Sequence, residues 1–155
     1  MNAVSHFLGI DSVDAGLTVQ NKKALFQQLG AAAGRRLGVA AKDVTACISE
    51  REKLGSTGFG AGIAIPHGKL DGLDRVFGYF ARLTAPIDFQ SVDGLPVDLV
   101  FLLLSPVDAG ADHLKALASV SRVLRDRPML DKLRGARSKD ALFALLVGTE
   151  SQHAA

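Results

Sequence analysis

Two histidines stand where the sequence favours chemistry by an imidazole ring. His67 lies between a proline and a glycine, directly after a glycine-rich turn and the short apolar stretch at residues 63–65. This order predicts a stiff strand that ends at the histidine. His113 falls at the predicted start of a helix, where free backbone N–H groups and the positive end of the helix dipole favour a bound phosphate. The pair therefore suggests phosphoryl chemistry.

Neutral imidazole is a nucleophile near physiological pH, because its ordinary pKa of ~6.5 leaves one ring nitrogen without a proton. Phosphoryl transfer then depends mainly on positioning and on stabilising charge at three equatorial oxygens. We expect His113, Arg51 and the N–H groups of the glycine loop to supply the hydrogen bonds. A second interpretation of His113, as an exposed residue in the first turn of a helix, stays open here.

The glycine-rich loop does not match the common nucleotide-binding motifs. A P-loop needs a glycine five residues before its Gly-Lys pair, where this chain has Ile63, and a hydroxyl after the lysine, where it has Leu70. The glycines at 58, 60 and 62 have the wrong last interval for a dinucleotide fingerprint, and a predicted strand follows them. The loop is then either a place of close backbone approach to a ligand or a flexible connection.

Length and composition fit one domain. A chain of 155 residues with 48% hydrophobic content is long enough to bury roughly 68–70% of its unfolded surface. The net charge of +2 does not indicate nucleic-acid binding, and the basic residues between Arg122 and Lys139 alternate with aspartates, which predicts a solvated helical face. The apolar run from Leu99 to Leu104 is far shorter than the ~18 residues of a membrane span. With no leader pattern at the N-terminus, we expect a cytoplasmic protein without membrane insertion.

The single cysteine and the remaining histidines suggest no metal site. Cys47 lies on the apolar side of a predicted helix, as a small buried hydrophobic residue in a reducing compartment would. The histidines lack metal-ligand spacing, and His6 and His153 are assigned no role because they lie in terminal segments. We expect neither a metal nor a cofactor.

Hydrophobic periodicity predicts an alternation of helices and strands. Residues 97–104 are almost continuously apolar, as expected of a central strand that is covered on both faces. The pattern indicates a single layered α/β domain with a sheet flanked by helices. The expected strands are residues 63–65, 76–83 and 97–104, and the expected helices are residues 21–37, 41–54, 112–125, 129–134 and 138–147.

Residues 51–69, which read REKLGSTGFGAGIAIPHGK, resemble the active-site signature of the enzyme IIA family of the phosphotransferase system, fructose and mannitol type. Residues 93–101 and 111–117 also resemble this family, and the similarity extends from Thr18 to Val147. Among its branches, the chain is most similar to the nitrogen type. The resemblance implies a mixed sheet with helices on both faces in a domain of residues 18–150, with an N-terminal extension (1–17) and a C-terminal tail (151–155).

The resemblance also implies roles for individual residues. His67 would accept a phosphoryl group from the phosphohistidine of a small HPr-like carrier (NPr), His113 would be the second active-site histidine, and Arg51 would help to bind the phosphate. At Ala61 many relatives have asparagine or a carboxylate, so a polar contact made there would be missing. Further phosphate contacts are expected from Ser56, Thr57, Gly58, Gly60 and Gly68.

These expectations describe a phosphotransferase that works as a regulatory phosphocarrier. Phosphorylation adds ~1.5–2 negative charges, which changes the proteins that a docking face can bind. The resemblance implies regulatory targets among potassium-transport, sensor-kinase and stringent-response proteins. Two alternatives stay open: a sugar-type IIA subunit that passes phosphate to a separate IIB protein during carbohydrate uptake, and a non-catalytic module whose glycine loop binds an anion.

Overall fold

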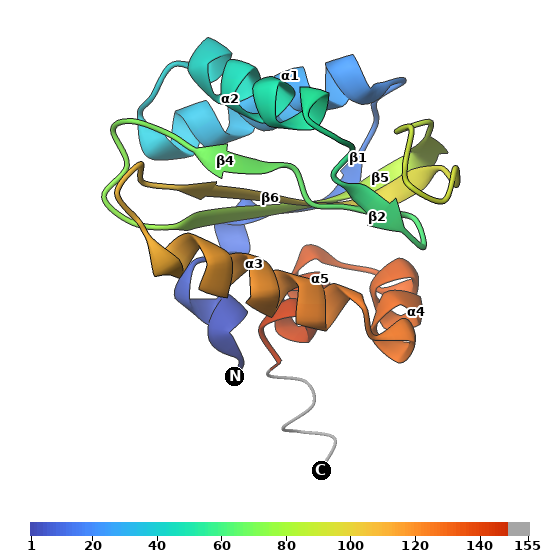
Figure 1. Ribbon diagram of the computed structural model, residues 1–155. Helices are drawn as coiled ribbons and strands as arrows, with labels where there is room; N and C mark the ends of the chain where they lie inside the picture. Colours follow the sequence, from blue (N-terminus) through green and yellow to red (C-terminus); the bar gives the residue numbers. More distant parts are fainter. Residues whose placement is uncertain (149–155) are drawn as a thin grey trace.

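The computed structural model, which describes residues 1–148, contains a six-stranded mixed sheet between two layers of helices (Figure 1). The strands are β1 (Val13–Leu17), β2 (Gly58–Gly60), β3 (Ile63–Ala64), β4 (His67–Lys69), β5 (Phe77–Ile87) and β6 (Val97–Ser105). Their order is β1-β5-β6-β3-β2, and β4 also pairs with β6. The pairs β5–β6 and β2–β3 are antiparallel, and the others are parallel.

Helices cover both faces of this sheet (Figure 1). On one face lie α1 (Lys22–Leu37) and α2 (Ala41–Lys53), and on the other lie α3 (Ala111–Leu124), α4 (Arg127–Gly135), α5 (Lys139–Val147) and the 3-10 turn η1 (Ala3–His6). None of the helices within residues 1–148 has the length and apolar character needed to span a bilayer. The predicted fold class, a single α/β domain with a mixed sheet flanked by helices on both faces, is confirmed.

The helix ends follow from local chemistry. Asn21 and Ser138 cap the starts of α1 and α5 by accepting hydrogen bonds from the backbone N–H groups three residues later. Gly38 ends α1 in the left-handed conformation with φ 70°. The fourth helix begins two residues before its predicted start, because Asp126 caps it and Pro128 fits within its first turn.

The central strand β6 supplies side chains to both hydrophobic cores. Its residues 99–104 are apolar without interruption, because alternate residues point to opposite faces of the sheet and both faces are covered. The predicted central position of this strand, covered on both faces, is confirmed. Leu99, Phe101 and Leu103 belong to the core under α3 and α5, and Val100, Leu102 and Leu104 belong to the core under α1 and α2.

The first 17 residues, for which the sequence predicted no helix or strand, belong to the packed structure. Val4 and Leu8 are buried in the core under α3 and α5, and β1 pairs in parallel with β5. The Asn2 backbone N–H and side-chain amide donate hydrogen bonds of 2.9 Å to the carbonyl oxygens of Val147 and Leu146. The expected tail at residues 151–155, which includes His153, lies outside the described residues.

The prediction that a strand ends at His67 is wrong, since this residue begins β4. Proline has no N–H to donate, so Pro66 interrupts the pairing with β6 at the junction of β3 and β4. The Pro66 carbonyl still accepts a hydrogen bond of 3.0 Å from the Leu103 N–H. Both short strands thus pair with β6, and His67 lies opposite Leu103.

A charge cluster holds the turn between β2 and β3. Ala61, at the tip, has a φ of 58°, which is unusual for a residue with a side chain. Its N–H donates to the Asp93 carboxylate at 3.0 Å, and its carbonyl accepts from the Arg134 guanidinium at 2.7 Å. The same guanidinium donates to both oxygens of Asp98 at 2.9 and 2.8 Å. The turn is therefore tied to β6 and α4.

Replacing Ala61 by asparagine is expected to raise the free energy of unfolding by about 0.5–1 kcal/mol, because asparagine adopts the left-handed conformation at lower cost. Urea unfolding followed by circular dichroism measures this change. Ala61→Val is the matched control and should lower stability, because a β-branched residue is strained at positive φ. An Ala61→Asn variant less stable than wild type would contradict the prediction.

Candidate active site

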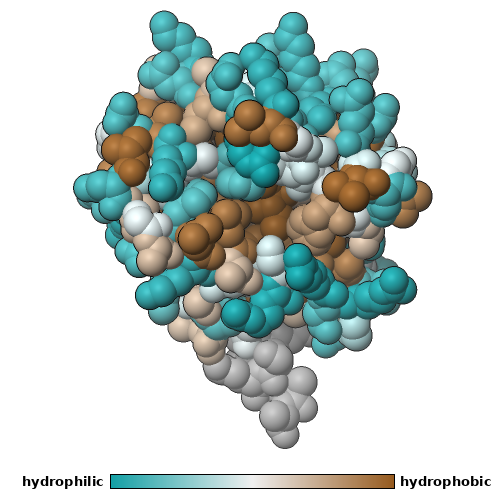
Figure 2. All heavy atoms as spheres, viewed as in Figure 1, coloured by the Kyte–Doolittle hydropathy of each residue, from teal (hydrophilic) through white to brown (hydrophobic). Residues whose placement is uncertain are grey.

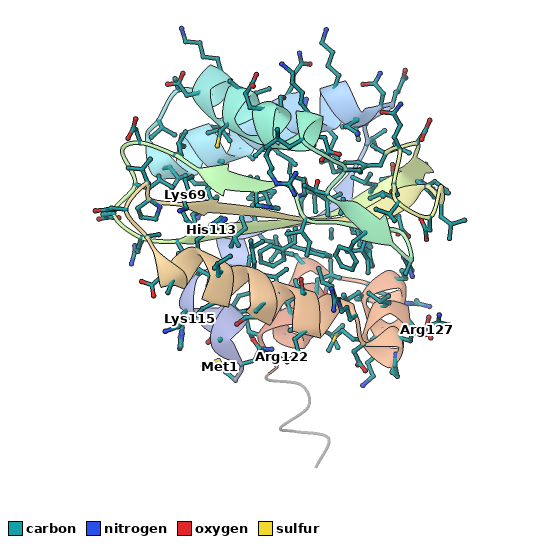
Figure 3. The ribbon with its side chains drawn as sticks, viewed as in Figure 1. Met1, Lys69, His113, Lys115, Arg122 and Arg127 are labelled. Carbon is teal, nitrogen blue, oxygen red and sulfur yellow. The ribbon has the colours of Figure 1, made fainter. Side chains whose placement is uncertain are left out.

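The structure brings the two predicted histidines together. The centres of their rings lie 5.8 Å apart, and the ring planes are inclined by 47°. His67 begins β4 and His113 lies in the first turn of α3, and β6 connects both elements by pairing with β4 and leading into α3. Figure 3 shows His113 between the sheet and α3, close to Lys69 at the end of β4.

The His67 ring is fixed by its own backbone. Its Nδ1 lies 2.7 Å from the Ile65 carbonyl oxygen. Because a carbonyl can only accept, Nδ1 carries the proton and the lone pair remains on Nε2. Burial lowers the pKa of His67, the Ile65 carbonyl raises it, the Arg51 charge lowers it and the Glu52 charge raises it, so that the pKa lies below its ordinary value. The ring is therefore a neutral nucleophile at pH 7.

The second histidine is buried. Only 8% of His113 is exposed, and its Nδ1 lies 2.7 Å from the Ser105 hydroxyl oxygen. Burial lowers the pKa of His113, and its electrostatic interactions with His67 and Lys69 lower it further. The interpretation of His113 as an exposed first-turn residue is therefore wrong. Within residues 1–148, no side-chain hydrogen bond caps the start of α3, and His113 lies in its first turn, near the positive end of the helix dipole.

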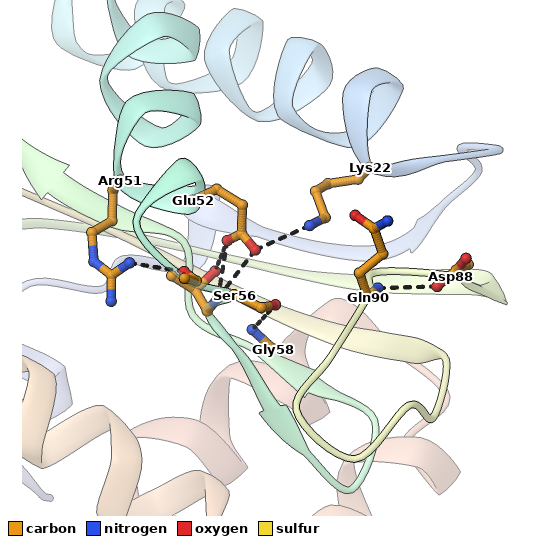
Figure 4. Close-up of polar contacts among 9 residues, drawn as sticks. Lys22, Arg51, Glu52, Ser56, Gly58, Asp88 and Gln90 are labelled. Carbon is orange, nitrogen blue, oxygen red and sulfur yellow. Dashed lines mark hydrogen bonds and ion pairs between the residues drawn. The ribbon is translucent and has the colours of Figure 1, made fainter.

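Arg51 is held in the last turn of α2, close enough to His67 to lower its pKa. Its Nη1 donates a hydrogen bond of 2.9 Å to the Gly55 carbonyl (Figure 4). This is the only hydrogen-bond acceptor of the guanidinium within residues 1–148. The remaining N–H groups are thus available to an anion.

Glu52 anchors the loop that follows α2 (Figure 4). Its side chain, 8% exposed, forms an ion pair of 3.1 Å with Lys22. Its oxygens also accept hydrogen bonds of 3.0 and 3.1 Å from the Thr57 backbone N–H, and another from the Thr57 hydroxyl. The Lys22 ammonium lies 4.5 Å from the centre of the Phe89 ring. One carboxylate therefore joins α1, α2 and the loop at residues 54–57.

These bonds use groups that were expected to contact phosphate. The N–H and hydroxyl of Thr57 are bound to Glu52, and the Gly58 N–H donates to the Ser56 hydroxyl at 3.1 Å. The structure thus uses Thr57, Gly58 and Ser56 to shape the loop. Only 7% of Thr57 is exposed, which leaves little of it open to a ligand.

Gly60 and Ala61 are not brought next to the histidines. They lie at the tip of the β2–β3 hairpin, beyond Ile63, which pairs with Leu99 of β6. His67 pairs with Leu103, farther along the same strand. The residue at 61 therefore acts here through its backbone, within the charge cluster of the turn.

Gly68 has a packing role in this fold. A Cβ atom at this position would lie 2.4 Å from the Cys47 sulfur, so the glycine lets α2 approach β4 closely. Cys47 packs beside the core as predicted but is only partly buried, and its Sγ lies 3.3 Å from the Lys69 carbonyl. Burial raises the pKa of the thiol, which makes it less reactive.

Two residues of the site were missed in the sequence. Ser105 ends the apolar run of β6, and a polar residue at a buried strand end signals a hydrogen-bond partner nearby. Glu52 lies in the last turn of a helix, where the dipole disfavours a carboxylate, and this signals a compensating contact. Both signals were visible, but neither identifies its partner.

The surroundings of the site combine apolar and basic side chains. Leu54, three residues after Arg51, is 84% exposed, and Leu114, next to His113, is 68% exposed. Figure 2 shows apolar side chains gathered in the middle of the face seen in Figure 1, above α3. Lys115, Arg122 and Arg127 extend outward from α3 and α4 (Figure 3), which agrees with the predicted solvated helical face. Among residues 1–148, no three His, Cys, Asp or Glu side chains are grouped to hold a metal ion.

Glu52→Gln is expected to lower the free energy of unfolding by about 1–3 kcal/mol, because it removes a buried charge partner of Lys22 and a strong acceptor for Thr57. Thermal or urea unfolding measures the change. Glu50→Gln is the matched control: its exposed ion pair with Lys53 should be worth less than about 1 kcal/mol. Equal effects of the two variants would argue against the anchor.

The lowered pKa values of both histidines predict a pH-dependent stability. Below the unfolded pKa of ~6.5 the unfolded chain binds more protons than the folded one, so the stability present above this pH is lost as the pH falls. An NMR titration of the ring protons should give midpoints below 6.5 for both. A midpoint of His67 above its ordinary value would contradict the assigned environment.

The chain is similar to known proteins over most of its length. The sequence model described as "Phosphoenolpyruvate-dependent sugar phosphotransferase system, EIIA 2" matches residues 6–148. The chain is 48% identical over 143 residues to a nitrogen regulatory protein of Bradyrhizobium diazoefficiens, covering 92% of this chain and 94% of that protein. It is 41% identical over 132 residues to the nitrogen regulatory protein of Escherichia coli K12, covering 84% and 81%.

A solved structure is similar over nearly the whole chain. Nitrogen regulatory protein IIA-Ntr from Neisseria meningitidis superposes with a TM-score of 0.88 at 34% identity, covering 92% of this chain and 98% of that one. Mannitol IIA from Escherichia coli, at 24% identity and a TM-score of 0.73, shares the fold. The chain therefore belongs to the EIIA type-2 family of the phosphoenolpyruvate-dependent sugar phosphotransferase system.

Proposed function

We propose that the protein is a regulatory phosphocarrier of the nitrogen-type phosphotransferase system, in which His67 accepts a phosphoryl group from an HPr-like phosphohistidine carrier. The observation that carries the proposal is the ring of His67, which is neutral, has its lone pair on Nε2 and lies 5.8 Å from a second histidine ring. Membership of the EIIA type-2 family supports it. The setting is the cytoplasm.

The transfer needs no separate base. The Nε2 lone pair of His67 forms a bond to phosphorus while the P–N bond of the donor breaks, and the donor imidazole leaves with that electron pair. The acceptor ring becomes an imidazolium that keeps its proton on Nδ1. The Ile65 carbonyl, 2.7 Å from that nitrogen, stabilises the new positive charge. The proton of His67 therefore stays in place throughout.

Three groups stabilise the negative charge on the phosphoryl group during transfer. Arg51 offers the guanidinium N–H groups that are not bound to Gly55, and His113 offers its second ring nitrogen. The uncapped start of α3 adds the positive end of a helix dipole. Such donors stabilise charge best where water is partly excluded, as around the half-buried His67 ring and the buried His113 ring. Thr57, Gly58 and Gly60 have no part in this proposal.

The output of the carrier is a change in protein contacts. Phosphorylation would add ~1.5–2 negative charges to a face with exposed leucines at 54 and 114, which alters the partners this face can hold. Regulatory targets such as potassium-transport, sensor-kinase and stringent-response proteins belong to this proposal. The names of the bacterial relatives, nitrogen regulatory proteins, favour it over a sugar-uptake subunit that serves a separate IIB protein.

Incubation with a phosphorylated HPr-like donor, followed by intact-mass measurement, tests the assignment. Wild type should gain one phosphoryl group that survives alkali and is lost in acid. His67→Ala should gain none, because no other nucleophile of the site has a free lone pair in the same position. An equal gain in His67→Ala, or a product stable in acid, would show that the acceptor is another residue.

Arg51→Ala separates the phosphocarrier from a passive anion-binding module. Losing a charge-stabilising donor should slow transfer by roughly 10²-fold while circular dichroism remains native. Lys53→Ala is the matched control: it lies in the same helical turn but is paired with Glu50 on the surface, and its transfer rate should match wild type. If wild type binds inorganic phosphate but accepts none from the donor, the module is the better description.

A further inference from the structure

Ser105 forms a buried contact with the second histidine that the proposed chemistry has not yet used. It is the last residue of β6 and has no exposed surface. Its Oγ lies 2.7 Å from the Nδ1 of His113, and its carbonyl accepts a hydrogen bond of 2.8 Å from the Leu70 N–H. The residue is thus fixed by main-chain pairing while its side chain meets the ring.

The hydrogen-bond partners available to Ser105 Oγ and His113 Nδ1 decide which of these two atoms is the donor. Within residues 1–148, His113 is the only hydrogen-bond partner of the Ser105 hydroxyl. If Nδ1–H donated to Oγ, the hydroxyl proton would be left without an acceptor in a fully buried position, which is costly. If the hydroxyl donates to Nδ1, this donor and this acceptor are both satisfied. The second arrangement places the proton of the neutral ring on Nε2.

We propose that Ser105 is a positioning residue that holds His113 in the Nε2–H tautomer, so that this neutral histidine donates a hydrogen bond to the phosphoryl group on His67. The inference rests on the proposed function of His67. It adds the residue and the atom that make His113 a donor while its ring is neutral.

The two histidines then take opposite tautomers for one physical reason. The Ile65 carbonyl can only accept and keeps the proton of His67 on Nδ1, which leaves a lone pair on Nε2. The Ser105 hydroxyl donates and keeps the proton of His113 on Nε2. One ring is therefore the nucleophile and the other is the hydrogen-bond donor. Both rings take these roles in their neutral forms before transfer.

NMR detection of the ring nitrogens in the unmodified full-length chain tests the tautomer. In wild type, the proton of neutral His113 should be on Nε2 alone. Ser105→Ala should give a mixture of both tautomers, and Ser105→Thr, which keeps the hydroxyl, should restore the single form. A wild-type His113 protonated on Nδ1, or an unchanged tautomer in Ser105→Ala, would overturn the proposal.

The rate of phosphoryl transfer gives the second readout. Ser105→Ala should be slower by roughly 10-fold to 100-fold, the range found when the partner that orients a metal-bound histidine is removed, and Ser105→Thr should recover most of the loss. Ser91→Ala is the matched control, because Ser91 is also buried but its hydroxyl has no partner within the described residues. It should transfer at the wild-type rate and leave the His113 tautomer unchanged.

The experiments can reject the role of His67 and the role of Ser105 independently of each other. If wild type accepts no phosphoryl group, the proposed function is wrong, whereas the tautomer measurement does not depend on transfer. If wild type accepts the phosphoryl group and Ser105→Ala accepts it at the same rate, the positioning role of Ser105 is overturned, while the role of His67 stands.

Discussion

The end of β6 is the constraint on which the candidate site depends. One strand supports both histidines, because Leu103 pairs with His67 and Ser105 bonds to His113 two residues later. The strand is itself fixed by two hydrophobic cores, one on each face of the sheet. Side chains that must act together within a few ångströms are best placed by rigid elements. Here the rigid element is a strand that is buried along almost its whole length.

A second feature of the site is that burial and nearby cations together keep its histidines neutral. Burial is the largest cause of both lowered pKa values, and Arg51 and Lys69 add to it. Neutrality suits a nucleophile, since a protonated imidazole has no lone pair to offer. The same cations favour the phosphorylated state, whose added charge is negative. For the proposed phosphocarrier, this arrangement favours the reactive neutral form before transfer and the charged product after it.

Sequence reasoning found the two histidines and Arg51 because their signals are local. A proline and a glycine around His67, a helix start at His113 and the long signature at residues 51–69 can be read without a structure. The fold class followed from the alternation of apolar periods and from the family resemblance. The continuous apolar run of β6 also showed that this strand is covered on both faces.

What the sequence did not reveal depends on contacts between distant residues. The glycines at 58 and 60 were assigned to phosphate because small residues permit close approach, yet the chain uses them in a short hairpin. The role of Gly68 depends on Cys47, which lies across the interface between α2 and β4. Likewise, Glu52 meets Lys22 only because α1 and α2 pack together. Periodicity and motif spacing carry no information on such pairs.

In the proposed phosphocarrier, the Ile65 carbonyl holds the proton of His67 on Nδ1 and leaves Nε2 as the nucleophile. The most direct test is to identify the phosphorylated ring nitrogen by NMR, after transfer from an HPr-like donor to nitrogen-15 labelled protein. We predict phosphorus on Nε2 of His67, with the proton still on Nδ1. Phosphorus on Nδ1 would require the bond to Ile65 to break and would contradict the account.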